Sequence, residues 1–109
     1  MRPDKLDDAA VDAWLGNHPG WRRSVTAAGG VGGGAGEGKK AIVKEFGFKD
    51  FSAALGFVVR VGLAAERRDH HPDVELGWGR ASVLWSTHDA GGITRLDLEL
   101  AEATDGLIP

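Results

Sequence analysis

Apolar residues recur at steps of three and four along three segments of the chain, the spacing that places side chains on one face of a helix. In residues 6–15 this stripe is Leu6, Ala10 and Trp14, and acidic residues occupy the first turn, where the helix dipole favours them. The pattern predicts a short amphipathic helix that ends in the turn-forming residues 17–20.

The longest helical pattern begins after Asp50, whose side chain suits the N-cap position. It must end by His71, because the residue before a proline is displaced from helical backbone angles. The periodic positions predict one buried stripe, made of Phe51, Ala54, Leu55, Val58, Gly62 and Ala65.

A third helix is predicted after Thr94, with Leu96, Leu100 and Ala103 on its apolar face. Asp97 falls at the third helical position, where a carboxylate caps the helix and meets its dipole. Capping alone would therefore account for Asp97.

Four strands are predicted between these helices. Residues 21–27 form a weak candidate, residues 41–46 a better one, and residues 74–78 alternate between apolar and polar side chains. A turn at 79–80 then leads into residues 81–87, where Ala81, Val83, Trp85 and Thr87 share one face. The order helix, strand, strand, helix, strand, strand, helix predicts an α+β fold: a four-stranded antiparallel sheet with helices packed on one face.

Residues 29–38 contain seven glycines and separate the first two predicted strands. Because glycine loses much backbone entropy on ordering, this run is typical of a flexible loop. A phosphate-binding loop is disfavoured, because the run leads through Lys39 and Lys40 into a strand and not into a helix.

Length and composition describe one domain spanning residues 1–109, with 42% apolar and 27% charged residues. The formal charge of −3 gives no excess of positive charge for gripping a phosphate backbone, so we expect no direct nucleic-acid binding. The chain has no cysteine, which excludes disulfides and thiolate chemistry. No apolar run approaches the roughly 20 residues of a membrane span and no secretory signal is visible, so we expect a cytoplasmic protein.

Three histidines in the second half of the chain are the strongest candidates for chemistry. His70 and His71 are adjacent, His88 follows, and Glu66 precedes His70 by four residues, which on a helix would place the two on one face. A His-His-Pro run also fits a plain helix end with polar surface residues. A metal site is disfavoured, because zinc needs three or four converging ligands and adjacent residues on an extended chain point apart.

The spacing between these residues is specific. It comprises Glu66, three intervening residues, His70-His71-Pro72, five residues, Trp78, nine residues, His88, eight residues and Asp97. This pattern resembles the signature of the pterin-4a-carbinolamine dehydratase family. Residues 41–51 and 86–94 also resemble that family, as does the Gly20-Trp21 dipeptide, and the resemblance is clear over about residues 41–101.

The resemblance implies that His70, His71 and His88 are catalytic residues. His70 and His88 would exchange protons with the substrate and His71 would orient it, with Glu66 polarising the histidine pair and Asp97 orienting His88 or contacting the ring. The residues implied to bind substrate are Glu66, Pro72, Trp78, Thr87, Asp97 and Trp21. The two tryptophans also suit a core, since an indole is large and apolar.

The activity implied by the resemblance is loss of water from a 4a-hydroxytetrahydropterin, which gives a quinonoid dihydropterin for tetrahydrobiopterin recycling. The leaving oxygen must gain a proton and N5 must lose one. Imidazole, with an ordinary pKa of about 6.5, suits both transfers, so no cofactor and no metal are expected. The expected partners are the pterin substrate, a second or further copies of the chain in a homodimer or homotetramer, and a functional link to an aromatic amino-acid hydroxylase. The alternative is a non-catalytic dimerisation or assembly-factor module of the same fold.

Overall fold

The computed structural model describes residues 4–24 and 41–108, and the predicted glycine-rich loop at 29–38 lies outside them. The elements follow the predicted order. They are α1 (Asp8–Gly16), β1 (Arg22–Ser24), β2 (Ala41–Gly47), α2 (Phe51–Arg68), β3 (Asp73–Gly77), β4 (Arg80–Trp85), the short 3₁₀ helix η1 (His88–Ala90) and α3 (Arg95–Asp105).

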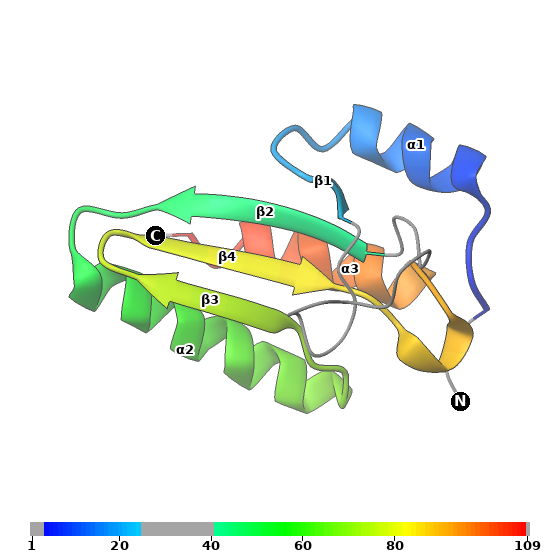
Figure 1. Ribbon diagram of the computed structural model, residues 1–109. Coiled ribbons are helices and arrows are strands. Elements are labelled where there is room, and N and C mark those ends of the chain that lie inside the picture. The colour runs from blue at the N-terminus through cyan, green and yellow to red at the C-terminus, as the bar shows by residue number, and fades with distance from the viewer. Residues whose placement is uncertain (1–3, 25–40, 109) are drawn as a thin grey trace.

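The four strands form one antiparallel sheet in the order β1-β2-β4-β3. In Figure 1, α2 and α3 lie behind this sheet and α1 lies beside β1. This confirms the predicted α+β fold. Asp73 pairs with Leu84, so the start of β3 lies beside the end of β4. The pairing therefore brings the His-His-Pro segment, which precedes β3, to the end of the sheet where the chain leaves β4.

The core lies between the sheet and its helices. The side chains that share one face of the last predicted strand are all buried: Ala81, Val83, Trp85 and Thr87. The remainder of the core comes mainly from β2, α2 and α3, with Ile42, Phe46, Phe57, Val61 and Leu100 among its buried side chains.

Helix α2 begins and ends close to the predicted positions. Asp50 is its N-cap and accepts a hydrogen bond from the backbone N–H of Ala53 at 2.8 Å. The helix ends at Arg68, and Asp69 takes a left-handed conformation with φ of 50°, which turns the chain out of the helix. His70 and His71 therefore follow the helix and do not belong to it.

The predicted buried stripe of α2 is wrong in part. The side chains that the core covers are Ala54, Phe57, Val61 and Ala65. Gly62 is exposed, and Phe51 and Leu55 are more than two-fifths exposed. The helix carries apolar residues on two faces, and the sheet covers the face that contains Phe57 and Val61. Because both faces have helical spacing, the spacing alone did not show which of the two is buried.

The connection between β3 and β4 also differs from the prediction. β3 ends at Gly77, and the turn is formed by Trp78 and Gly79 in place of Gly79 and Arg80. Gly79 has a φ of 74°, a conformation that glycine adopts without strain. Trp78 is consequently 73% exposed at the tip of the hairpin.

Helix α1 and the segment that follows it contact α3 through the indole N–H groups of two tryptophans. Trp14 Nε1 donates to Glu102 at 2.8 Å, and Trp21 Nε1 donates to Asp105 at 3.0 Å. Lys44 on β2 forms an ion pair with the same Asp105 at 2.8 Å. Trp21 is thus a core residue held by α3. Among the described residues, no helix is long and apolar enough to cross a membrane.

Candidate active site

His70 lies at the centre of a buried polar network. Its side chain is 6% exposed, and its Nε2 lies 2.6 Å from Oδ1 of Asp97, a carboxylate with no exposed surface. The imidazole also stacks on the indole of Trp85, with the ring centroids 5.9 Å apart and the planes 10° from parallel. The network therefore joins the segment after α2, the end of β4 and the start of α3.

The second oxygen of Asp97 is held by the start of α3. Its Oδ2 accepts from the backbone N–H of Thr94 at 2.8 Å and from the hydroxyl of Thr87 at 2.7 Å. Thr94 and Asp97 form the predicted capping box. The prediction that capping accounts for Asp97 is therefore confirmed but incomplete, because the same carboxylate also holds His70.

Asp97 contacts a different histidine from the one expected, whereas Glu66 contacts one member of the expected histidine pair. Asp97 bonds to His70, which contradicts the expectation that Asp97 orients His88, and its full burial leaves it no surface for a pterin ring. Glu66 bonds to His71 Nε2 at 2.7 Å in place of His70, because the left-handed Asp69 rotates the chain before the two histidines. The Glu66–His71 pair is solvent-exposed, with both side chains more than half accessible.

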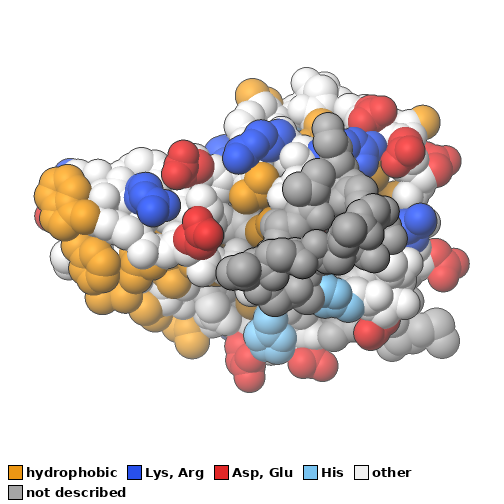
Figure 2. Space-filling view, viewed as in Figure 1, with side chains coloured by type: hydrophobic (Ala, Val, Ile, Leu, Met, Phe, Trp, Pro, Cys, Tyr) orange, Lys and Arg blue, Asp and Glu red, His pale blue; other side chains and the backbone are white. Residues whose placement is uncertain are grey.

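His88 opens η1 directly after Thr87 and is exposed. The hydroxyl of Thr87 lies 3.4 Å from His70 Nε2, so the chain places His88 next to a residue that touches the buried histidine. In Figure 2, pale-blue histidine surface lies beside red acidic surface on the viewed face. The site thus combines one buried imidazole, His70, with two exposed ones, His71 and His88.

The remaining predicted substrate-binding residues have other environments. The Thr87 hydroxyl is buried and engaged by Asp97 and Thr94, so it has no free face for a ligand. Trp21 packs in the core against Phe46. Trp78 lies at the far end of β3 from His71, a separation of about 17 Å for a five-residue strand, which excludes it from the site of its own chain. Pro72 is half-buried next to His71.

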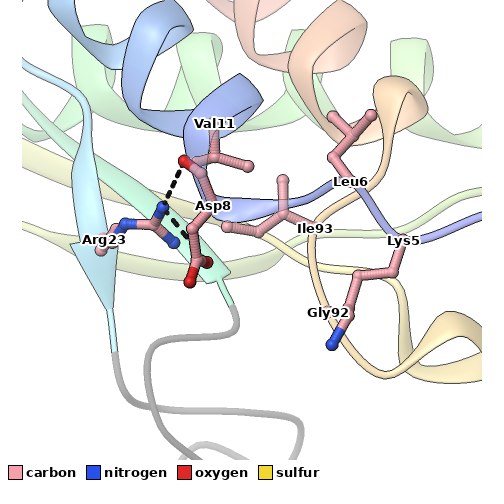
Figure 3. A pocket seen from close by; sticks show the side chains of 7 residues that line it. All are labelled: Lys5, Leu6, Asp8, Val11, Arg23, Gly92 and Ile93. Carbon is pink, nitrogen blue, oxygen red and sulfur yellow. Dashed lines mark hydrogen bonds and ion pairs between the residues drawn. The ribbon is translucent and has the colours of Figure 1, made fainter.

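A small hollow lies near this region, between the segment before α1, β1 and the loop that precedes α3. Figure 3 shows its lining: Lys5, Leu6, Asp8, Val11, Arg23, Gly92 and Ile93. Its volume of about 60 Å³ suits a few water molecules and not a fused bicyclic ring. Arg23 is engaged by Asp8 and Asp12 at its edge.

Two contributors to the site were not singled out from the sequence. The sequence placed Trp85 only on one face of a strand, and Thr94 only at the start of a helix. Two signals taken together could have identified Trp85 and Thr94. They are the capping signature Thr-x-x-Asp and the alternation that places Trp85 and Thr87 on one face. Over the described ranges, no three His, Asp or Glu side chains are grouped so as to hold a metal ion.

Comparisons with known proteins show the family to which the chain belongs. Residues 4–107 match the family model described as pterin 4 alpha carbinolamine dehydratase. A Rhodospirillum rubrum protein named "Putative pterin-4-alpha-carbinolamine dehydratase" is 42% identical over 105 residues, which cover 96% of this chain and 97% of that protein. A relative with the same name from Bradyrhizobium sp. strain BTAi1 is 52% identical over 71 residues, 65% of this chain and 72% of its own.

Solved structures show the same fold. The Brucella melitensis protein described as a transcriptional coactivator/pterin dehydratase matches with a TM-score of 0.78 and 30% identity, over 97% of this chain and 100% of its own. A pterin dehydratase-like protein described as a RuBisCO assembly factor in the alpha-carboxysome matches with a TM-score of 0.61 at 17% identity, over 84% of this chain and 92% of its own, which shows the fold alone. The fold is that of a pterin-dehydratase-like α+β protein. The chain belongs to the pterin-4-alpha-carbinolamine dehydratase family.

Proposed function

We propose that this protein removes water from a 4a-hydroxytetrahydropterin. In this reaction the C4a–O bond breaks, the oxygen leaves as water after gaining a proton, N5 loses its proton, and a C4a=N5 double bond forms. No electrons are exchanged with another molecule. The product is the quinonoid dihydropterin, which a reductase returns to the tetrahydro form. The proposal places the protein in tetrahydrobiopterin recycling in the cytoplasm, with a functional link to an aromatic amino-acid hydroxylase.

The observation that carries this proposal is the grouping of His70, His71 and His88 at one end of the sheet. An elimination of this kind needs both a proton donor and a proton acceptor, and imidazole serves in either role near neutral pH. We assign proton exchange to His70 and His88. His71, which is exposed and paired with Glu66, binds and orients the pterin.

A comparison of histidine variants tests the assignment. The purified protein should accelerate dehydration of a 4a-hydroxytetrahydropterin, and His70→Ala and His88→Ala should each lower kcat by about 10²- to 10⁴-fold, the usual contribution of acid–base catalysis. His18→Ala is the matched control, because His18 stacks on Trp14 between α1 and α3 and contacts none of the site residues. Unchanged rates in both site variants, or a parent protein without activity, would refute the function.

We further propose that the active form is a homo-oligomer built through α2. Phe51, Leu55, Val59 and Leu63 recur at steps of four and are 42%, 43%, 50% and 59% exposed, so they form an apolar stripe on the solvent face of the helix. Figure 2 shows a band of apolar side chains on the same flank of the molecule. A ridge of residues spaced by four is the feature that packs against the same ridge of another helix. A second copy of this chain supplies that ridge.

A further inference from the structure

We propose that Lys5 is a positioning residue for His88: its aliphatic stem lies across Gly92 and keeps closed the loop that carries this histidine. The part of the inference that concerns catalysis rests on the proposed dehydration. The contact between Lys5 and Gly92, and its effect on the loop, do not depend on any reaction.

The loop that carries His88 is closed by backbone hydrogen bonds between its two ends. The N–H of Thr87 donates to the carbonyl of Gly92 at 2.9 Å, and the N–H of Gly92 donates to the carbonyl of Thr87 at 3.2 Å. The same Thr87 carbonyl accepts from the N–H of Gly91 at 3.0 Å. His88 is the first residue inside this closure, so its position depends on whether the loop stays closed.

The residues that follow the loop pair with the segment before α1. Lys5 forms an isolated antiparallel bridge with Thr94, and the N–H of Leu6 donates to the carbonyl of Ile93 at 2.8 Å. This pairing places the side chain of Lys5 against Gly92 at the end of the loop (Figure 3). Gly92 is buried, whereas Lys5 is exposed. The stem of Lys5 therefore covers the backbone of the loop while its charged end stays in water.

Lys5 occupies the space where a side chain at position 92 would begin. A Cβ atom on Gly92 would lie 2.7 Å from Cδ of Lys5 and 3.2 Å from its Cγ, closer than the roughly 3.5–4.0 Å of a favourable carbon contact. The φ of Gly92 lies outside the left-handed region, so Lys5, and not the backbone, disfavours alanine there. Gly91 is the converse case, with a φ of 77° and no described atom beyond its chain neighbours within 4 Å of such a Cβ. The two glycines thus separate the contact with Lys5 from backbone strain.

Amide hydrogen exchange in the intact protein tests the contact. Gly92→Ala must displace the stem of Lys5 or open the loop, so the amides of residues 91 and 92 should exchange about tenfold faster than in the parent. In Lys5→Ala/Gly92→Ala the new methyl group occupies the space that the stem leaves, so exchange should return to within about twofold of the parent. Gly91→Ala is the matched control, because Lys5→Ala should not relieve its backbone strain. Unchanged exchange in Gly92→Ala, or additive losses in the double variant, would overturn the inference.

Kinetics test the consequence for His88. Lys5→Ala and Gly92→Ala should each lower kcat about tenfold with KM unchanged, since displacing a catalytic group by about 1 Å costs up to about 10²-fold. Lys5→Met keeps an unbranched apolar stem without the charge and should retain the parent kcat. A Lys5→Met variant as slow as Lys5→Ala would assign the effect to the ammonium group and overturn the positioning role, as would a rise in KM in place of the fall in kcat. If the parent lacks dehydratase activity, the proposed function fails, whereas the exchange rates still decide whether Lys5 holds the loop closed.

Discussion

A glutamate in the middle of the exposed α2 stripe tests the proposed assembly. Val59 is 50% exposed and is flanked one turn away by Leu55 and Leu63. Burying a whole valine side chain contributes about 1.5–3 kcal/mol, so covering the exposed half of Val59 contributes about 1 kcal/mol per chain. A two-fold interface contains each position twice, which makes the lost contribution about 2 kcal/mol, or roughly a 30-fold change in the dissociation constant. Burying two unpaired carboxylates costs several kcal/mol more.

Val59→Glu should therefore convert the oligomer to a monomer at micromolar concentration, as measured by light scattering after size exclusion. Its far-ultraviolet circular dichroism should be unchanged, because Val59 is not part of the core. Arg60→Glu is the matched control: it places a carboxylate on the neighbouring residue, which is exposed and lies outside the stripe. A parent protein that is monomeric at high concentration would refute the reasoning, as would a Val59→Glu variant that keeps the parent mass.

Three further changes have defined outcomes. Phe57→Ala removes a fully buried ring that contacts Phe46 at a centroid distance of 4.8 Å, and should lower the free energy of unfolding by about 3–5 kcal/mol in urea titrations; a loss below about 1 kcal/mol would show that the site collapses to fill the cavity. Glu66→Gln breaks an exposed ion pair with His71, so the free energy of unfolding should change by less than about 0.5 kcal/mol. The KM for the pterin should rise. An unchanged KM would show that Glu66 does not contribute to substrate binding. Trp78→Ser should leave kcat and KM of the parent protein unchanged, because Trp78 lies at the other end of β3 from His71. Reduced activity in a Trp78→Ser variant that keeps the parent mass would contradict its exclusion from the site.

Local signals in the sequence predicted most of the fold. Asp50 and Thr94 were recognisable as N-caps because capping depends on a side chain and the few backbone groups that follow it. The alternation in β4 predicted which of its side chains share a face, because successive residues of a strand point to opposite sides of the sheet. Each of these signals depends on neighbours along the chain, which is why a single sequence could reveal them.

The errors arose where the outcome depended on distant parts of the chain. Helix α2 has apolar side chains on two faces, and only the position of the sheet decides that Phe57 is buried and Leu55 is exposed. The sequence also did not show which histidine of the pair Glu66 contacts, because this depends on the left-handed backbone conformation of Asp69. The family resemblance grouped the three histidines, yet it did not reveal which of them the fold buries.

The burial of His70 also follows from the double use of Asp97. A carboxylate that caps α3 must lie against the first turn of that helix, and here the first turn packs beside Thr87 at the end of β4. His70 contacts the other oxygen of this carboxylate and is therefore buried beside Asp97. The contact that orients His70 and the contact that begins α3 are therefore made by one side chain, and a substitution at Asp97 changes stability and proton placement together. Asp97→Asn keeps a carbonyl oxygen that can cap α3, but it removes the negative charge that the helix dipole stabilises and places an amide group that can donate beside His70.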